Sequence, residues 1–153
     1  MPDHGRDQVV DAVITQVTGL TTTGSNVVDS PVYPFSTLPA LAVYPGEEEI
    51  VADTRTLGKR VVRRLEVKIE GRAKEHSEAD PSLRTVLGTI CAEVEAAIAD
   101  DESLAGLVRS IELAGTETEF SGEEEQPVGK VTMTWVADYA TTTDDPTTVL
   151  GYT

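Results

Sequence analysis

Residues 60–73 constrain the fold most, because apolar and charged side chains alternate along this segment. The apolar positions are Val62, Leu65, Val67, Ile69 and Gly71, and the charged positions between them are Arg64, Glu66, Lys68 and Glu70. A repeat of two residues predicts a β-strand with one face against a core and the other in water. Such a strand needs partner strands, so the chain is expected to contain a sheet.

Two other segments carry apolar side chains at helical spacing. In residues 4–18 the stripe is Val9, Val10, Val13, Ile14 and Val17. The second helix is expected to begin at Asp80-Pro81, with an acidic N-cap and proline at the first helical position, and to run through residue 99. Gly88 inside it costs about 1 kcal/mol relative to alanine, so close backbone approach is expected there.

The remaining strands are expected at residues 26–33, 38–44, 110–120 and 128–140. Residues 47–59 are expected to form a charged loop, with residual strand at its start as an alternative. The order is therefore helix, three strands, helix, two strands. This order predicts an α+β fold, in which two helices pack on one face of a single, mainly antiparallel sheet of about five strands. Residues 1–143 are expected to form the domain, and residues 144–153, rich in Thr, Asp and Pro, an extended C-terminal arm.

Charge and composition exclude several classes of protein. Twenty-seven acidic residues against 12 basic ones give a formal net charge of −15, which repels nucleic-acid phosphates rather than binding them. The single cysteine, Cys91, cannot form an intrachain disulfide. The N-terminal residues lack the pattern of a signal peptide, and no stretch approaches the roughly 18 apolar residues of a membrane span. We expect a soluble protein of a cytoplasm without a membrane partner.

The sequence predicts no catalytic, cofactor-binding or metal-binding residue, and hence no enzyme. His4 and His76 lack a supporting Ser, Cys or Asp constellation and are expected to be solvated, while Cys91 lies on an apolar helix stripe and is expected to be structural. The glutamate runs 47–49 and 123–125 lack the alternating ligands and turning glycine of a calcium loop. A carboxylate-pair or metal-dependent hydrolase stays open as an alternative of another class.

Half of the basic residues concentrate in one strand and its borders, namely Arg60, Arg63, Arg64, Lys68, Arg72 and Lys74. One interpretation is that this strand balances acidic neighbours within the monomer. The other is that a basic edge meets the acidic edge of an identical neighbour.

Several segments, taken in order, resemble the tail-terminator, or tail-completion, proteins of long-tailed bacteriophages. They are helix 9–20 running into Thr21-Thr22-Thr23-Gly24, the run Leu38 to Tyr44, the strand Arg63 to Glu70, the helix Ala92 to Ile98, and Gly115 to Gly122 leading through Pro127-Val128-Gly129 to a strand ending at Tyr139. The resemblance covers most of residues 8–146. It rests on packing and turn patterns and brings no catalytic residues with it.

The resemblance implies a virion protein, assembled in the host cytoplasm as a homo-oligomeric ring of usually six subunits. Such a ring caps the head-proximal end of the tail tube, stops tube polymerisation and contacts the major tail tube protein and the neck or head–tail connector. Six copies would carry six times −15, or −90, which would let DNA pass through the lumen without binding. The alternative within the virion is a neck, head-completion or tail-tube-like component.

Three groups of residues receive roles under this interpretation. Arg60, Arg63 and Arg64 are expected near subunit boundaries, facing acids of a neighbour. The lumen wall is expected to include Glu47, Glu48 and Glu49 or Glu123, Glu124 and Glu125. The C-terminal arm is expected to be mobile in the free monomer and to dock on an adjacent subunit or a tail or neck partner through Val149, Leu150 and Tyr152.

Overall fold

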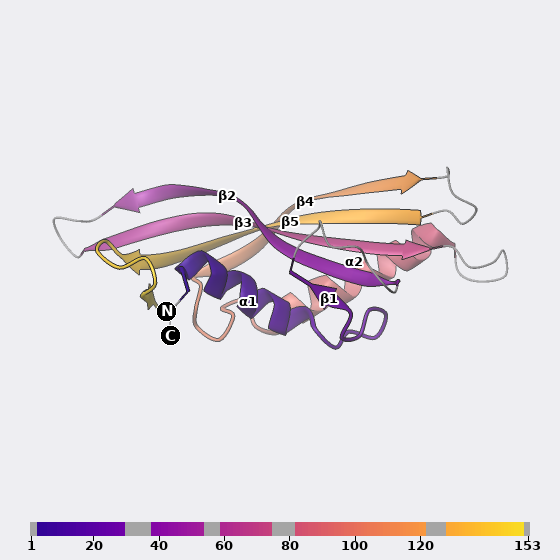
Figure 1. The fold of residues 1–153 in the computed structure, drawn as a ribbon, viewed down its shortest axis with the longest axis horizontal. Coiled ribbons are helices and arrows are strands. Elements are labelled where there is room, and N and C mark those ends of the chain that lie inside the picture. Colours follow the sequence, from indigo (N-terminus) through magenta and orange to yellow (C-terminus); the bar gives the residue numbers. More distant parts are fainter. Residues whose placement is uncertain (1–2, 30–37, 54–58, 75–81, 122–127, 152–153) are drawn as a thin grey trace.

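The fold is a twisted sheet with two helices on one face, as seen in a computed structural model that describes residues 3–29, 38–53, 59–74, 82–121 and 128–151 (Figure 1). The elements are α1 (Gly5–Val17), β1 (Val27–Val28), β2 (Ala40–Asp53), β3 (Arg60–Lys74), α2 (Leu83–Asp100), β4 (Ser110–Ser121), β5 (Val128–Thr142) and β6 (Val149–Leu150). The predicted α+β class is confirmed, and so is the order of one helix, three strands, a second helix and two strands, although β1 has only two residues.

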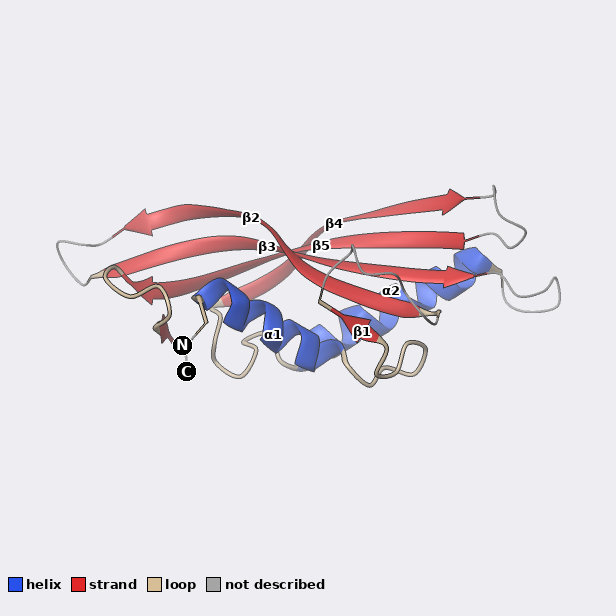
Figure 2. Cartoon of the chain, viewed as in Figure 1, coloured by secondary structure: helices blue, strands red, loops and turns tan. Residues whose placement is uncertain are grey.

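Four long antiparallel strands form the body of the sheet. The order is β1-β2-β3-β5-β4, with β1 parallel to β2 and with β6 pairing with β5. Figure 2 shows both helices on the same side of these strands, so the opposite face is not covered by any described element. The sheet therefore has a helix-covered face and an open face.

The predicted alternation in β3 fixes which side chains enter the core. Leu65, Val67 and Ile69 are fully buried on the helix-covered face, and the register with β5 places them level with Ala137, Trp135 and Met133. At the start of the strand the buried residue is Val61 rather than Val62. Parity explains this, because Val61 shares the face of Leu65 whereas Val62 shares the open face of Arg64.

Both helices begin at side-chain caps and bury one stripe each. His4 precedes α1, and its Nδ1 accepts the backbone N–H of Arg6 at 3.0 Å. The α2 cap is Ser82, which accepts from the Thr85 N–H; the predicted start at Asp80 and Pro81 lies outside the described residues. A Cβ added to Gly88 would meet nothing within 4 Å, so the close approach expected there does not occur within the described part of the chain.

Strand β2 continues to Asp53. Residues 47–53 therefore form the strand that the sequence offered only as an alternative at the start of the charged loop over 47–59. Its pairing with β3 tolerates two irregularities, between Pro45 and Glu48 and between Ile50 and Ala52. Bulges of this kind let a strand absorb an extra residue without ending the ladder. The charges in this stretch therefore do not end the strand, because most of them lie at the sheet surface.

The C-terminal segment folds back onto its own chain as far as the structure describes it. Val149 and Leu150 form β6 and pair with Thr141 and Ala140. The carbonyl of Pro146 accepts the N–H of Gly5 at 2.8 Å, and the side chain of Gln8 donates to the carbonyl of Thr147 at 2.7 Å. The expected arm thus contains a sixth strand, because the edge of β5 beyond the start of β4 offers a ladder to pair with.

Truncation after Thr143 is expected to lower the free energy of unfolding by roughly 2–4 kcal/mol, the sum of two half-buried apolar side chains and the lost partner of the Gly5 N–H. Urea denaturation followed by fluorescence of Trp135, the only tryptophan, measures the loss. A chain ending at Gly151 keeps every described contact of β6 and is the matched control. Equal midpoints for the two chains would show that the segment adds no stability.

Candidate functional site

The open face of the sheet is the candidate site, because it presents polar side chains from four strands without a covering layer. The strand registers place these side chains in rows across the sheet. One row joins Glu49, Arg64, Asp138 and Ser110, and another joins Ala40, Arg72, Lys130 and Glu119. This face is therefore a wall of mixed charge.

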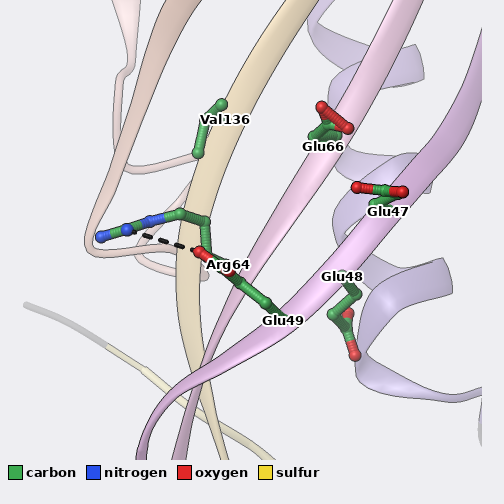
Figure 3. Close-up of a pocket in the computed structure, with 6 residues that line it drawn as sticks. All are labelled: Glu47, Glu48, Glu49, Arg64, Glu66 and Val136. Carbon is green, nitrogen blue, oxygen red and sulfur yellow. Dashed lines mark ion pairs between the residues drawn. The ribbon is translucent and has the colours of Figure 1, made fainter.

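A shallow hollow of about 450 Å³ lies on this face and is lined by Glu47, Glu48, Glu49, Arg64, Glu66 and Val136 (Figure 3). Arg64 is its only lining cation, and its guanidinium holds Asp138 at 3.0 Å and Glu49 at 3.6 Å. The hydrogen bond to Asp138 is the main reason that the pKa of Arg64 is raised above its ordinary value. The positive charge in the hollow is therefore already engaged.

Three carboxylates near Arg64 are not held by an ion pair, although the charge of Glu112 contributes to the raised pKa of Arg64. Glu47, Glu66 and Glu112 form no ion pair or hydrogen bond with any described residue. Lys68, the next cation along β3, donates instead to the Thr134 hydroxyl at 2.8 Å. We call Glu47, Glu66 and Glu112 the carboxylate row, since they lie on β2, β3 and β4 between the levels of Arg64 and Lys68.

The far end of the open face is charge-balanced. Glu70 is buried and forms ion pairs with Arg72 at 2.6 Å and with Lys130 at 3.7 Å. It also accepts a hydrogen bond from the Tyr44 hydroxyl at 3.5 Å. Burial, with the charge of Glu70, raises the pKa of Tyr44. Carboxylates without an ion-pair partner are thus concentrated in the middle of the open face, at the carboxylate row.

A second polar cluster lies on the helix-covered face, where β2 and β5 approach α1. The hydroxyl of Tyr139, which is fully buried, donates to Glu48 Oε2 at 2.6 Å. Arg63 donates to Glu48 Oε1 at 2.9 Å and, through Nε, to the Thr141 hydroxyl at 3.1 Å. Each of these polar groups is satisfied inside the cluster, so its role is structural.

Alkaline pH is expected to destabilise the fold through Tyr139. Burial, followed by the hydrogen bond to Glu48, raises the pKa of Tyr139 above its ordinary value of 10. The unfolded chain then releases this proton near pH 10 whereas the folded chain retains it, so its stabilising contribution is complete below pH 10 and is lost above it.

The loss attributable to Tyr139 is about 1.4 kcal/mol per pH unit above pH 10. Urea midpoints of the wild type and of Tyr139→Phe, measured from pH 9 to pH 11, test it. The pKa of Tyr44 is also raised in the folded chain, so both proteins should lose stability as the pH rises. The unfolding free energy of Tyr139→Phe should fall less steeply with pH than that of the wild type. Identical slopes would show that Tyr139 ionises freely in the folded chain.

The structure places the predicted site residues as follows. Arg63 and Arg64 pair with acids of their own chain, and Arg60 is half-buried with a partner of its own. Among the residues predicted to line the lumen, Glu47 and Glu49 are exposed, whereas Glu48 is turned into the cluster with Tyr139. The second predicted run, Glu123, Glu124 and Glu125, lies outside the described residues.

The residues predicted to anchor the C-terminal arm on a partner contact their own chain instead. Val149 and Leu150 pair with β5, and Val149 also packs against the core. Tyr152 lies outside the described residues.

Sequence reasoning missed Glu66 and Glu112 as members of the acidic surface. Their positions in β3 and β4 could have indicated this, because alternate residues of a strand point to the same face of the sheet. Both glutamates occupy positions that point to the open face. It also missed the pairing of Glu48 with Tyr139, which are 91 residues apart. No local pattern indicates that contact.

The titratable groups that could serve catalysis occupy structural positions. His4 caps α1, and His76 lies outside the described residues. Burial, with the neighbouring Glu95, raises the pKa of the half-buried Cys91 thiol, which disfavours the reactive thiolate. Within the described ranges, no three His, Cys, Asp or Glu side chains are grouped to hold a metal ion. The two described helices are also too short or too polar to cross a membrane.

Comparison with known proteins gives matches to solved structures only. No protein-family profile matches the chain, and no curated protein matches its sequence. Twenty-nine chains of solved structures do match. One is described as the virion of a native gene transfer agent (GTA) particle, with 11% identity and a TM-score of 0.39 over 82% of this chain and 84% of that chain. A likeness of this size does not define a shared role.

Proposed function

We propose that this chain is a structural virion protein of the tail-terminator type. Six copies close into a ring at the head-proximal end of a phage tail tube, stop tube polymerisation and join the tail to the neck. In this proposal the chain performs no catalysis and takes no cofactor.

The observation that carries the proposal is the division of the surface between a helix-covered face and an open face of mixed charge whose middle is acidic. The open face has hollows that are wide and shallow, and it holds the unpaired carboxylate row, Glu47, Glu66 and Glu112. A wall with excess negative charge fits a lumen through which DNA must pass without binding, since like charges repel. A pocket for a small molecule would instead be deep and largely apolar.

The sequence resemblance supports the same assignment. The described parts of the segments that resemble tail-terminator proteins fall mostly in α1, β2, β3, α2, β4 and β5, which together build the sheet and its cover. The neck or tail-tube-like alternative would use the same surfaces, so position in the particle distinguishes the two. Arg63 and Arg64 pair with acids of their own chain on β3, one strand in from the edge strand β2, so in the proposed ring they lie behind a subunit boundary rather than facing acids of a neighbour. In the proposed ring the C-terminal segment lies near a tail or neck partner.

The experiment that tests the proposal is electron microscopy of tails assembled with and without this protein. With the protein present and heads absent, tails of uniform length should carry one ring at the tube end that would face the head. Without it, tubes should exceed the normal length. Normal tail lengths in its absence, or its presence only on filled heads, would contradict the terminator role.

Reversing the charge of the open face is expected to slow DNA ejection. Glu47→Lys, Glu49→Lys and Glu66→Lys together place three new cations per subunit on the proposed lumen wall, where they attract phosphates. Ejection is timed by release of dye-labelled DNA from purified particles.

A matched control is Glu95→Lys, Asp100→Lys and Glu102→Lys, which makes the same change in net charge at exposed positions on the helix side. The control should eject DNA at the normal rate. Equal rates for the two variants and the wild type would show that the open face does not line the lumen.

A further inference from the structure

We propose that neighbouring subunits join through their sheet edges, with the outer edge of β2 in one copy pairing with the outer edge of β4 in the next. This inference rests on the proposed function, because its occupant is a second copy of the chain in the ring. It goes beyond that function by assigning the contact surfaces.

Both edges are open within the described part of the chain. Strand β2 pairs with β3 on one side, and on the other β1 covers only Leu41 and Ala42. Strand β4 pairs with β5 alone over its length. Unpaired strand edges carry backbone donors and acceptors that form a ladder with another strand wherever one is offered.

The exposed apolar side chains are confined to these two strands. Among the described residues, the large hydrophobic side chains that remain exposed are Ile50 at 53%, Val51 at 39% and Phe120 at 57%. Ile50 and Val51 lie on β2, and Phe120 lies on β4. The other large hydrophobic side chains of the described residues are less exposed than these three, so the most exposed apolar side chains lie on the two edge strands.

The directions of β2 and β4, and their positions along the sheet, fit a head-to-tail contact between copies. β2 and β4 run in opposite directions in the sheet, so copies in the same orientation would bring them together as an antiparallel pair. The row through Arg64 puts Glu49 level with Ser110, and the row through Lys68 puts Tyr44 level with Gly115. The stretch of β2 from Tyr44 to Glu49 is thus level with the first half of β4, and the exposed Ile50, Val51 and Phe120 lie beyond the two ends of this stretch. A contact between two different surfaces propagates, and it closes into a ring when the rotation allows.

Charge disfavours the self-paired alternatives. Pairing two β4 edges about the strand centre would set Glu112 opposite Glu119 twice, and pairing two β2 edges would bring Glu47 and Glu49 together with their copies. The head-to-tail pair, in the register that sets Glu49 opposite Ser110, places only one pair of acidic residues opposite each other. They are Glu112 of one copy and Glu47 of the next. Like charges directly opposite each other destabilise a sheet. This seam would extend the carboxylate row around the whole ring.

Cysteine cross-linking tests the seam. In a Cys91→Ala background, Glu49→Cys and Ser110→Cys are combined in one chain, because facing residues of an antiparallel pair lie within disulfide reach. A second chain combines Glu49→Cys with Glu112→Cys and detects a register shifted by two residues. After oxidation, at least one chain should give a ladder of covalent oligomers that ends at the ring size. Chains with one of these cysteines should stop at monomer, and Trp135 fluorescence confirms that each variant is folded.

The outcomes separate this inference from the proposed function. Rings in the microscope without a covalent ladder from either double variant would overturn the edge pairing and leave the ring intact. Covalent dimers from a chain with a single cysteine would show two-fold pairing of like edges and would also overturn it. Absence of rings from the wild-type chain and from its tails would overturn both proposals. A further expected result is that Glu112→Gln raises the fraction of rings, because it removes the acidic couple at the seam.

Discussion

Replacing Glu48 with alanine is expected to lower the free energy of unfolding by roughly 3–5 kcal/mol, because it breaks a buried ion pair and leaves its partners without an acceptor. The side chain of Glu48 is 8% exposed and that of Arg63 is 16% exposed. The variant would leave the Arg63 guanidinium with the Thr141 hydroxyl alone and the buried Tyr139 hydroxyl without an acceptor. Urea denaturation at neutral pH measures the loss.

The matched control is Glu49→Ala on the same strand. Glu49 is exposed and pairs with the exposed Arg64 at 3.6 Å, and such a surface pair contributes only about 0–1 kcal/mol. Glu48→Gln keeps an acceptor for Tyr139 but removes the charge, so its loss should fall between the two. Equal losses for Glu48→Ala and Glu49→Ala would show that the cluster around Tyr139 does not support the fold.

Gly129→Ala is expected to destabilise the fold by roughly 1–3 kcal/mol, the usual cost of overpacking a tight core. A Cβ at this position would lie 2.8 Å from Leu87 Cδ1 and 2.9 Å from Leu83 Cγ. The first turn of α2 therefore rests directly on β5 at this glycine. Gly129→Val should cost more, since the two added methyl groups must displace α2 from the sheet.

Gly115→Ala provides the comparison within the same sheet. A Cβ added to Gly115 would meet nothing within 4 Å, and its backbone does not require a positive φ. Its stability should change little or rise slightly, because alanine reduces the freedom of the unfolded chain. Midpoints that fall by the same amount in both variants would indicate a general intolerance of strand alanines rather than close packing at Gly129.

The elements that could be predicted from sequence are those with a strong local period. The stripe of α2 and the alternation of β3 and β5 determine which face each element buries, and they are local properties. The extension of β2 through Glu47, Glu48 and Glu49 was not predictable in this way, because contiguous charges resemble a loop until the pairing with β3 is known. The two-residue strand β6 likewise depends on a free edge of β5, which no local pattern shows.

The candidate site was predictable only in part, for a related reason. Sequence identified the basic strand and left open whether its charges meet acids of the same chain. The partners of Arg63 and Arg64 are now defined as Glu48 and Asp138, and Asp138 lies 74 residues away. Contacts of that range are set by sheet order rather than by composition. The carboxylate row is defined in the same way, since Glu47, Glu66 and Glu112 come together only through the strand order β2-β3-β5-β4.

Reconstruction by cryo-electron microscopy of tails made without heads shows where this chain lies and which face of its sheet lines the channel. We expect one closed ring of this chain at the head-proximal tube end, with the open face of the sheet toward the lumen and α1 and α2 outside. Glu47, Glu66 and Glu112 would then line the channel wall. A ring with its helices toward the lumen, or tails in which this chain is absent from the tube end, would contradict this expectation.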